Sequence, residues 1–563
     1  MSKQKKKSKK RKSVSTPVVD KLTANQRIEN WLAKNGKWGL ILGWILFLIL
    51  YLSLATDELA GILGGDNAHY LMLAKSLALG KGYQDLYLPG EPAHTQYPFL
   101  FPLILSPFAL SARQTFYSHL LILFLGALVP LLAIAWARLS GRTRIESLVL
   151  FLVISTSPVY YKFLPNILSE APGMFFIYLG LFLIAYFRVK GLDGFKVFYL
   201  AIVALCAFYC RTVAVVIAPA LLLPLLIEPE FRKKKFLKVP YWVWFAGLFG
   251  LGMMPWLIFT KIHGGLSYLQ QLMVKDPYNI SLGTITFSDL ILRIKENFIF
   301  HFPSIGDIFE FGEKDSQREF LSGIICLALV VIGLIEEFRK KRWEGVSFFV
   351  LFILTFLTWS FKERRFLYPL IPLIAIYFLQ GLIILTKIFS KKLAQYLYLI
   401  LIPIFCWQAV QLGSITRRYH TPDPFPQSPI FIDGYGKFSE PVIDFSKYPS
   451  LWELDPAIKK FLSDRIVILK IAEKSLPQEA VILSGKPTLT WYYSQRKSVR
   501  FIYNGADEEN WENIKKYGVS YVLWEPTYSK QMNFLLKNPE LLEVVYLSVP
   551  TKTALFKISY YPE

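Results

Sequence analysis

The chain has 563 residues, of which 53% are hydrophobic and 16% aromatic, and its mean hydropathy is +0.38. These values exclude an ordinary soluble domain and indicate a multi-pass membrane protein. The formal net charge of +22 is divided into short basic blocks between apolar runs. That pattern is typical of membrane orientation signals, so nucleic-acid binding is not expected.

The N-terminal segment, residues 1–37, is rich in lysine and has no apolar core, which predicts a cytoplasmic tail that anionic lipid attracts. A first span is expected at about 38–55, and it leaves residues 56–113 as an external loop. In this loop, apolar residues recur at helical spacing from Ala68 to about Leu79, which predicts a helix on the membrane interface. The run from Pro98 to Leu110 is too short to span and is expected to be interfacial or re-entrant.

Apolar runs and the basic turns between them predict about eleven crossings in residues 38–412, with the N-terminus inside and the C-terminus outside. The runs from Glu146 to Phe187 and from Phe195 to Ile227 are each expected to cross twice, because basic residues flank both of their ends. Glu170 and Arg211 then lie at external turns. A second external loop, residues 260–319, contains an amphipathic stretch that predicts an interfacial helix or lid. The predicted fold class is an all-α polytopic bundle of the plasma (inner) membrane.

From residue 413 to residue 563 the composition becomes that of a soluble domain. Strand-like runs at 480–483, 499–503, 519–524, 544–547 and 554–558 alternate with helix-like runs at 487–493 and 507–517. This alternation predicts a small external α/β domain.

The candidate functional residues gather on one side of the membrane. On the predicted topology the external side carries Asp66, His69, His94, Glu170, Arg211, Arg364 and Arg365. Carboxylates beside arginines suit one class of reaction, in which an external carboxylate takes a proton from an acceptor hydroxyl while arginines hold a leaving phosphate.

Several short motifs carry a resemblance to a known family. The first external loop contains Asp66-Asn67-Ala68-His69-Tyr70, then Gly80-Lys81-Gly82-Tyr83, and then Tyr97-Pro98. Later segments are Ser169-Glu170-Ala171-Pro172 and the run Arg364-Arg365-Phe366-Leu367-Tyr368-Pro369. In this combination and order they resemble the polytopic C-type (GT-C) glycosyltransferases, the relatives of protein O-mannosyltransferases and lipid A aminoarabinose transferases.

The resemblance implies an inverting transfer of a sugar from a polyprenyl-phosphate donor to a glycan, lipid or protein acceptor on the outer side of the membrane. It implies that Asp66 is the catalytic base or a carboxylate that orients the acceptor, and that Glu170 is a second acidic group. It also implies that Arg364 or Arg365 contacts the phosphate. Substrate-binding candidates are Tyr70, His94, Arg211, Arg364 and Arg365. Two departures from the family pattern are Asn67, where many relatives have a second acid, and Gln96-Tyr97-Pro98-Phe99-Leu100, which lacks the lysine of the aminoarabinose branch.

Other interpretations of the same residues stay open. Asp66 and His69 are three residues apart and share a helical face, so with Glu170 or His94 they are candidates to ligate a divalent metal. Asp66 also suits a helix cap, and the arginines suit headgroup anchors. The alternative function is a transporter or flippase of a lipid-linked or anionic substrate. The expected spans argue against it because they lack ionisable residues near their middles.

Overall fold

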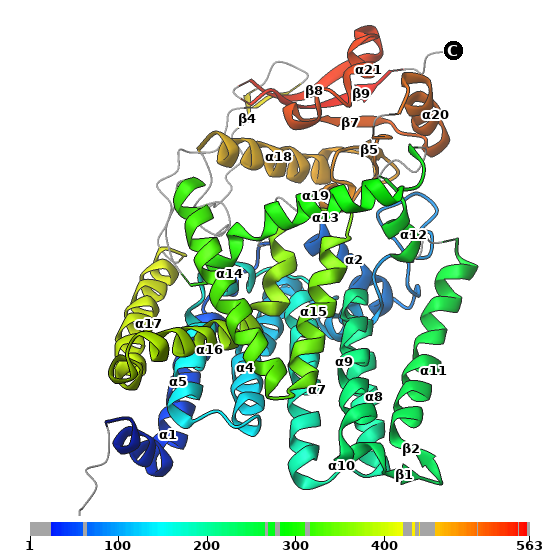
Figure 1. Cartoon of the computed structure of the whole chain (residues 1–563). Coiled ribbons are helices and arrows are strands. Elements are labelled where there is room, and N and C mark those ends of the chain that lie inside the picture. Colours follow the sequence, from blue (N-terminus) through cyan, green and yellow to red (C-terminus); the bar gives the residue numbers. More distant parts are fainter. Residues whose placement is uncertain are drawn as a thin grey trace, which may run out of the picture.

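A computed structural model describes residues 24–59, 65–264, 268–275, 282–309, 316–419, 431–433, 438–439, 456–503, 505–549 and 551–559. Most of the predicted basic tail, residues 1–23, lies outside this range. The molecule has two layers (Figure 1). Helices that run side by side form one layer, and a sheet with its own helices covers one end of that layer.

Seven helices in the described part of the chain are long and apolar enough to cross a membrane. They are α1 (Ala24–Leu52), α4 (Gln114–Leu139), α7 (Glu170–Lys190), α11 (Tyr241–Ile262), α14 (Ser316–Arg339), α16 (Ile371–Phe389) and α17 (Lys391–Tyr419). Shorter apolar helices stand among them: α8 (Gly194–Cys210), α9 (Ile217–Ile227) and α15 (Trp343–Leu357). Helix α5 (Arg144–Thr156) packs on α4. The chain is thus a multi-pass membrane protein, while the count of about eleven crossings stays a prediction.

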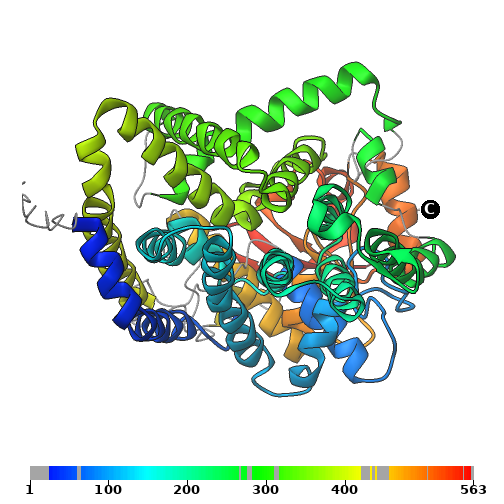
Figure 2. The same cartoon turned by 60° about the horizontal axis from the view of Figure 1, so that its bottom comes forward.

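Local sequence signals set where these helices begin and end. The Thr143 side chain accepts from the Glu146 backbone N–H, and the Glu146 carboxylate accepts from the Thr143 N–H, so α5 starts at a capping box. Basic residues occupy the last turns of α4, α7 and α14, where they complement the negative end of the helix dipole. Viewed from that end, the helices are seen almost end-on and the sheet lies behind them (Figure 2).

The bundle is tightest where α14 crosses α16. A Cβ added at Gly333 would lie 1.9 Å from the carbonyl oxygen of Tyr377, and one added at Gly381 would lie 2.0 Å from the carbonyl oxygen of Leu329. Glycine at both positions lets the two backbones touch, as small residues do between membrane helices. The crossing fixes α16, whose N-terminal end continues from the 3₁₀ turn Arg364–Leu370.

The end of the bundle that faces the sheet carries short elements. These are α2 (Asp66–Ala78), α3 (Leu100–Leu105), α6 (Pro158–Phe163), α12 (Tyr268–Met273) and the amphipathic α13 (Phe287–His301). The predicted interfacial helix is α2, but it does not lie exposed on a surface, because all its residues from Asn67 to Ala74 are buried. Helix α19 (Pro487–Ser494) of the C-terminal part packs on α2 and covers it.

The C-terminal part is a seven-stranded sheet in the order β4-β3-β8-β9-β7-β5-β6. Its strands are β3 (Phe431–Asp433), β4 (Phe438–Ser439), β5 (Val481–Leu483), β6 (Lys497–Val499), β7 (Tyr521–Trp524), β8 (Leu542–Ser548) and β9 (Thr553–Ile558). Strand β5 pairs in parallel with β6 and β7, and the other pairs are antiparallel. Helices α18 (Pro456–Ser475), α20 (Asp507–Tyr517) and α21 (Asn533–Leu536) accompany α19. The strand expected at 499–503 ends at Val499.

Candidate active site

Asp66, the first residue of α2, lies where the helix bundle meets the C-terminal part. Its Oδ2 atom accepts a hydrogen bond from Arg365 Nη2 at 2.8 Å, and its Oδ1 atom accepts one from the Tyr97 hydroxyl at 3.0 Å. The side chain is still 32% exposed, so a substrate can reach it. A carboxylate that is held by a guanidinium and a phenol, yet open on one side, has a fixed orientation and a free face.

Glu170, the first residue of α7, supplies the second carboxylate. Its Oε1 atom forms an ion pair with Arg211 Nη1 at 2.6 Å and lies 3.9 Å from Arg365 Nε. Beside it, the Tyr70 hydroxyl donates to Ser169 Oγ at 3.0 Å. The Glu170 side chain is only 6% exposed. Arg365 therefore stands between the two carboxylates, and Arg211 closes the other side of Glu170.

These groups line a cavity of about 290 Å³. Part of its wall is polar and the rest is apolar, with Leu168, Val213, Phe352, Phe356 and Phe366 on that side. The polar part has three carboxylates and two guanidiniums, those of Asp66, Glu170, Glu363, Arg211 and Arg365. Its formal charge is therefore −1, from −3 and +2. The two guanidiniums suit an anionic group of a ligand, and the apolar wall suits an apolar tail.

The charge of Arg365 decides the protonation of Asp66. Burial alone would raise the pKa of the Asp66 carboxyl, but the Arg365 guanidinium and the hydrogen bonds from Arg365 and Tyr97 outweigh it. The pKa of Asp66 therefore lies below its usual value of 3.8. Asp66 is ionised at neutral pH, which is the state that a proton acceptor needs.

The structure brings five of the predicted site residues into this cavity and leaves the others outside it. Those that line it are Asp66, Tyr70, Glu170, Arg211 and Arg365. Arg364 points away, because its guanidinium pairs with Glu319 at 2.8 Å and with Asp307 at 3.5 Å. Tyr97 also lines the cavity, although it was not among the predicted site residues. Its place in the motif Tyr97-Pro98 was the signal that the sequence offered.

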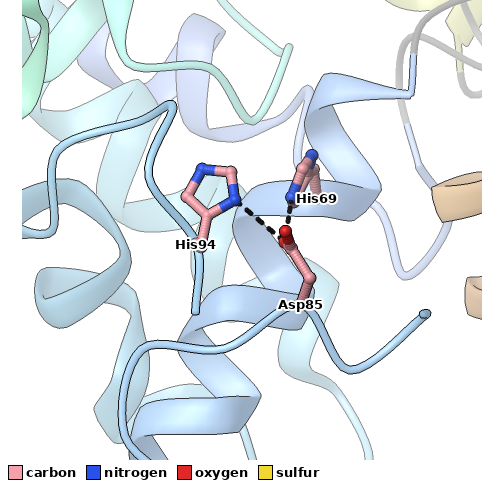
Figure 3. Close-up of side chains that lie close together, drawn as sticks. All are labelled: His69, Asp85 and His94. Carbon is pink, nitrogen blue, oxygen red and sulfur yellow. Dashed lines mark hydrogen bonds and ion pairs between the residues drawn. The ribbon is translucent and has the colours of Figure 1, made fainter. Parts of the chain in front are cut away.

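His69 and His94 lie together behind the cavity, around Asp85 (Figure 3). His69 Nε2 and His94 Nδ1 lie 2.8 and 2.9 Å from the same oxygen, Asp85 Oδ1. The rings of His69 and His94 each contact Tyr97 edge-on or tilted. Burial raises the pKa of Asp85, but hydrogen bonds from the two histidines outweigh it and keep that pKa below the usual range. The cluster fixes the loop that carries Tyr97.

No protein-family model matches the chain, and no curated protein matches its sequence. Solved structures do match its fold. One is the Archaeoglobus fulgidus oligosaccharyltransferase with a tethered acceptor peptide, at a TM-score of 0.52 and 10% identity over 89% of this chain and 70% of that one. Another is ArnT from Cupriavidus metallidurans bound to undecaprenyl phosphate, at a TM-score of 0.52 and 11% identity over 93% and 98%. The chain has the C-type glycosyltransferase fold.

The structural comparison confirms, at the level of the fold, the resemblance carried by the sequence motifs. The archaeal protein is also known with dolichol phosphate, at a TM-score of 0.51 and 11% identity over 88% of this chain and 70% of that one. A further crystal of it holds zinc and sulfate. These ligands are those of the solved proteins, because a shared fold does not by itself imply a shared ligand.

Two places in the fold hold carboxylate or imidazole groups of the kind that bind a divalent metal. Between Asp66 and Glu170, a dication would face the guanidiniums of Arg365 and Arg211, which already neutralise both carboxylates. The second place is the cluster of His69, Asp85 and His94, whose ligand atoms lie within 4.8 Å of one another. Two imidazoles and a carboxylate are a donor set that zinc accepts.

The hydrogen bonding of His94 does not fit a metal at that cluster. The backbone N–H of Tyr97 donates to His94 Nε2 at 2.8 Å, so this nitrogen carries no proton. In a neutral imidazole the proton is then on Nδ1, the atom that faces Asp85, and a protonated nitrogen cannot bind a metal. The direct contacts of both histidines with Asp85 are hydrogen bonds that need no ion.

Proposed function

We propose that the chain is a membrane glycosyltransferase that moves a sugar from a polyprenyl-phosphate donor to an acceptor hydroxyl on the extracytoplasmic side. One observation carries the proposal. An ionised, partly exposed carboxylate, Asp66, shares the guanidinium of Arg365 with a buried second carboxylate, Glu170, in a half-apolar cavity at the end of a membrane bundle. The likeness of the fold to membrane glycosyltransferases supports the same class of reaction.

The donor would enter with its phosphate on Arg365 and Arg211 and its prenyl chain along the apolar wall. Guanidiniums bind phosphate through paired hydrogen bonds and stabilise the charge that develops on a leaving phosphate. Glu170 holds Arg211 and, at longer range, Arg365, so it orients both cations. The side chains of Tyr70 and Ser169 add two hydroxyl groups to the lining of the cavity.

In the transfer step, the acceptor oxygen forms a bond to the anomeric carbon while the bond between that carbon and the phosphate oxygen breaks. The proton of the acceptor hydroxyl passes to Asp66, and polyprenyl phosphate leaves with the bonding electrons. Attack from the face opposite the phosphate inverts the anomeric centre. Tyr97 donates to Asp66 Oδ1 and so directs the other lone pairs of the carboxylate toward the open side.

The test is turnover of a panel of polyprenyl-phosphate sugars by the purified protein and by Asp66→Asn. The amide cannot take the proton, so we expect a fall in kcat of about 10²- to 10⁴-fold. Asp57→Asn is a matched control, because Asp57 lies in the same loop but pairs with Arg113 on the surface, and we expect it to keep full activity. Thermal unfolding would show that both variants are folded.

Turnover retained by Asp66→Asn would remove Asp66 from the mechanism. Failure of every donor with folded wild-type protein would instead favour the alternative of a transporter or flippase for an anionic lipid. That alternative has no support in the arrangement of charges seen here, since the cavity cations lie at one end of the bundle.

A further inference from the structure

A short β-hairpin joins α9 to α11 at the end of the bundle that lies away from the C-terminal sheet (Figure 1). It follows α10 (Pro229–Arg232) and consists of β1 (Lys235–Phe236) and β2 (Val239–Pro240), which pair antiparallel. The turn residues Leu237 and Lys238 both have a positive φ, of 50° and 67°, as the commonest two-residue hairpin turn requires. Helix α11, a candidate membrane span, begins directly after β2. The hairpin therefore lies where the chain enters the membrane.

Contacts with two helices hold the hairpin in place. The indole N–H of Trp244 in α11 donates to the carbonyl oxygen of Phe236 at 2.9 Å, and the two rings meet edge to face. Phe236 also lies against the start of α8, because a Cβ added at Gly194 would come within 2.5 Å of its ring. The Lys234 ammonium donates to the carbonyl oxygen of Leu192 at 3.4 Å. The hairpin is thus packed against the bundle.

Four cationic side chains of this segment have no partner among the residues that the structure describes. They are Arg232, Lys233, Lys235 and Lys238, and all four are exposed. Only Lys234, which is half-buried, is used to tie the hairpin to the bundle. The exposed cations are therefore available to an external anion.

The carboxylates around the hairpin do not balance its cations. The basic side chains of residues 188–196 and 228–240 are Arg188, Lys190, Lys196, Arg232, Lys233, Lys234, Lys235 and Lys238. The acidic side chains are Asp193, Glu228 and Glu230 of the same segments and Glu344 of α15. Arg188 pairs with Glu228 and Glu344, and Lys196 pairs with Asp193. The formal charge is +4, from +8 and −4, and the excess lies on the exposed cations of the hairpin.

Apolar side chains are exposed among these cations. Leu237, at the tip of the hairpin, is 72% exposed, and Phe195, at the start of α8, is 75% exposed. The ring centroids of Phe195 and Phe236 lie 6.4 Å apart, so the two rings form one apolar edge. Apolar groups between lysines suit the depth of a bilayer at which acyl chains meet headgroups, because hydrocarbon and phosphate lie together there.

We infer that this hairpin binds anionic phospholipid in the leaflet at its end of the bundle. Its exposed lysines contact the lipid phosphates, and Leu237 inserts among the upper parts of the acyl chains. A basic cluster next to a membrane helix attracts anionic lipid. Two features favour a lipid over an acidic protein or a nucleic acid, since the hairpin directly precedes a membrane span and its tip is apolar. The inference does not depend on the proposed transferase function.

The test uses the full-length protein in liposomes, with a fluorophore on Leu237→Cys in a background without the four native cysteines. A lipid with a spin label near the top of its acyl chain quenches the fluorophore when the two are in contact. We expect spin-labelled phosphatidylglycerol, which is anionic, to quench about twofold more than spin-labelled phosphatidylcholine, which has no net charge. Both lipids meet the same fluorophore, so the comparison reports the headgroup. Added salt should reduce the difference, because it screens the charges.

The preference for the anionic lipid is expected to depend on the lysines of the hairpin. With Lys233→Gln, Lys235→Gln and Lys238→Gln combined, the two lipids should quench equally. The matched control removes three exposed lysines of the C-terminal part and should keep the preference; it combines Lys530→Gln, Lys552→Gln and Lys557→Gln. Thermal unfolding would show that both proteins are folded.

Three outcomes would overturn the inference. One is equal quenching by both lipids when the lysines of the hairpin are intact. Another is a preference that survives their replacement. The third is a fluorophore that neither lipid quenches, which would place the tip of the hairpin in water; if polyglutamate then shields it, the partner is an acidic protein.

Discussion

At the residue scale, Arg365 links the state of the base to the presence of the donor. In the structure its guanidinium neutralises Asp66, and that contact keeps the pKa of the carboxyl low. A donor phosphate would compete for the same guanidinium. Asp66 would then lose part of this neutralisation and become a stronger base when the donor is bound.

This coupling predicts how activity depends on pH. Because the pKa of Asp66 is below 3.8 in the free protein, the acid limb of kcat/KM should fall only below about pH 4, whereas the acid limb of kcat should lie higher. Arg365→Met removes the main charge that lowers the pKa, so its acid limb of kcat/KM should move to higher pH. Steady-state rates of the wild type and of Arg365→Met from pH 3 to pH 8 with one active donor check this. An unchanged limb in Arg365→Met would contradict the coupling.

The adjacent residues Arg364 and Arg365 could not be assigned separate roles from the sequence alone. The motif Arg364-Arg365 indicated a phosphate contact but could not choose between the two. Adjacent residues of a 3₁₀ turn project about 120° apart, so only one of them can enter a given cavity. The structure selects Arg365, because Arg364 is held by Asp307 and Glu319 on the surface.

At the element scale, the loop between α2 and α3 depends on Asp85. Its carboxylate accepts from two imidazoles, and one of these, His94, accepts from the backbone of Tyr97. Through Tyr97 this network reaches Asp66. The cluster therefore acts as a support for the base, and hydrogen bonds hold it together.

Replacement of Asp85 is expected to loosen this loop. Asp85→Ala removes the oxygen that accepts from both imidazole N–H groups, which should cost about 1–3 kcal/mol of stability for each group left without an acceptor. A chelator should leave the unfolding of the wild type unchanged, since His94 has no free nitrogen for a metal. Thermal unfolding with and without chelator, together with elemental analysis, checks both statements. Stoichiometric zinc and chelator-sensitive unfolding would contradict the assignment of His94.

At the scale of the whole molecule, the distribution of charge predicts the orientation of the bundle in the membrane. Basic residues in the last turns of α4, α7 and α14 lie at the end away from the C-terminal sheet (Figure 1). Positive residues stay on the cytoplasmic side, so the sheet and the cavity are expected outside. The boundary between the transmembrane domain and the C-terminal domain, predicted between residues 412 and 413, also stays a prediction.

Cysteine labelling tests the orientation. In a background without the four native cysteines, Lys557→Cys on β9 should react with a membrane-impermeant maleimide in intact cells. Lys190→Cys, at the far end of α7, should react only after the membrane is opened. Both positions are exposed, so access depends only on the side of the membrane. The reverse pattern would invert the topology and place Asp66 in the cytoplasm.

The membrane class, the helical bundle and the loop that carries Asp66 could be predicted from the sequence, while the side of the membrane on which this loop lies stays a prediction. These follow from hydropathy, from basic turns and from helical spacing, all of which are local properties of the chain. Three features depend on the tertiary structure: α2 is buried under α19, Arg365 bridges Asp66 and Glu170, and the Thr488 hydroxyl donates to Gly65, the residue before Asp66. Those contacts join residues hundreds of positions apart. They depend on how the sheet docks on the bundle, for which no local pattern in the chain gives a signal.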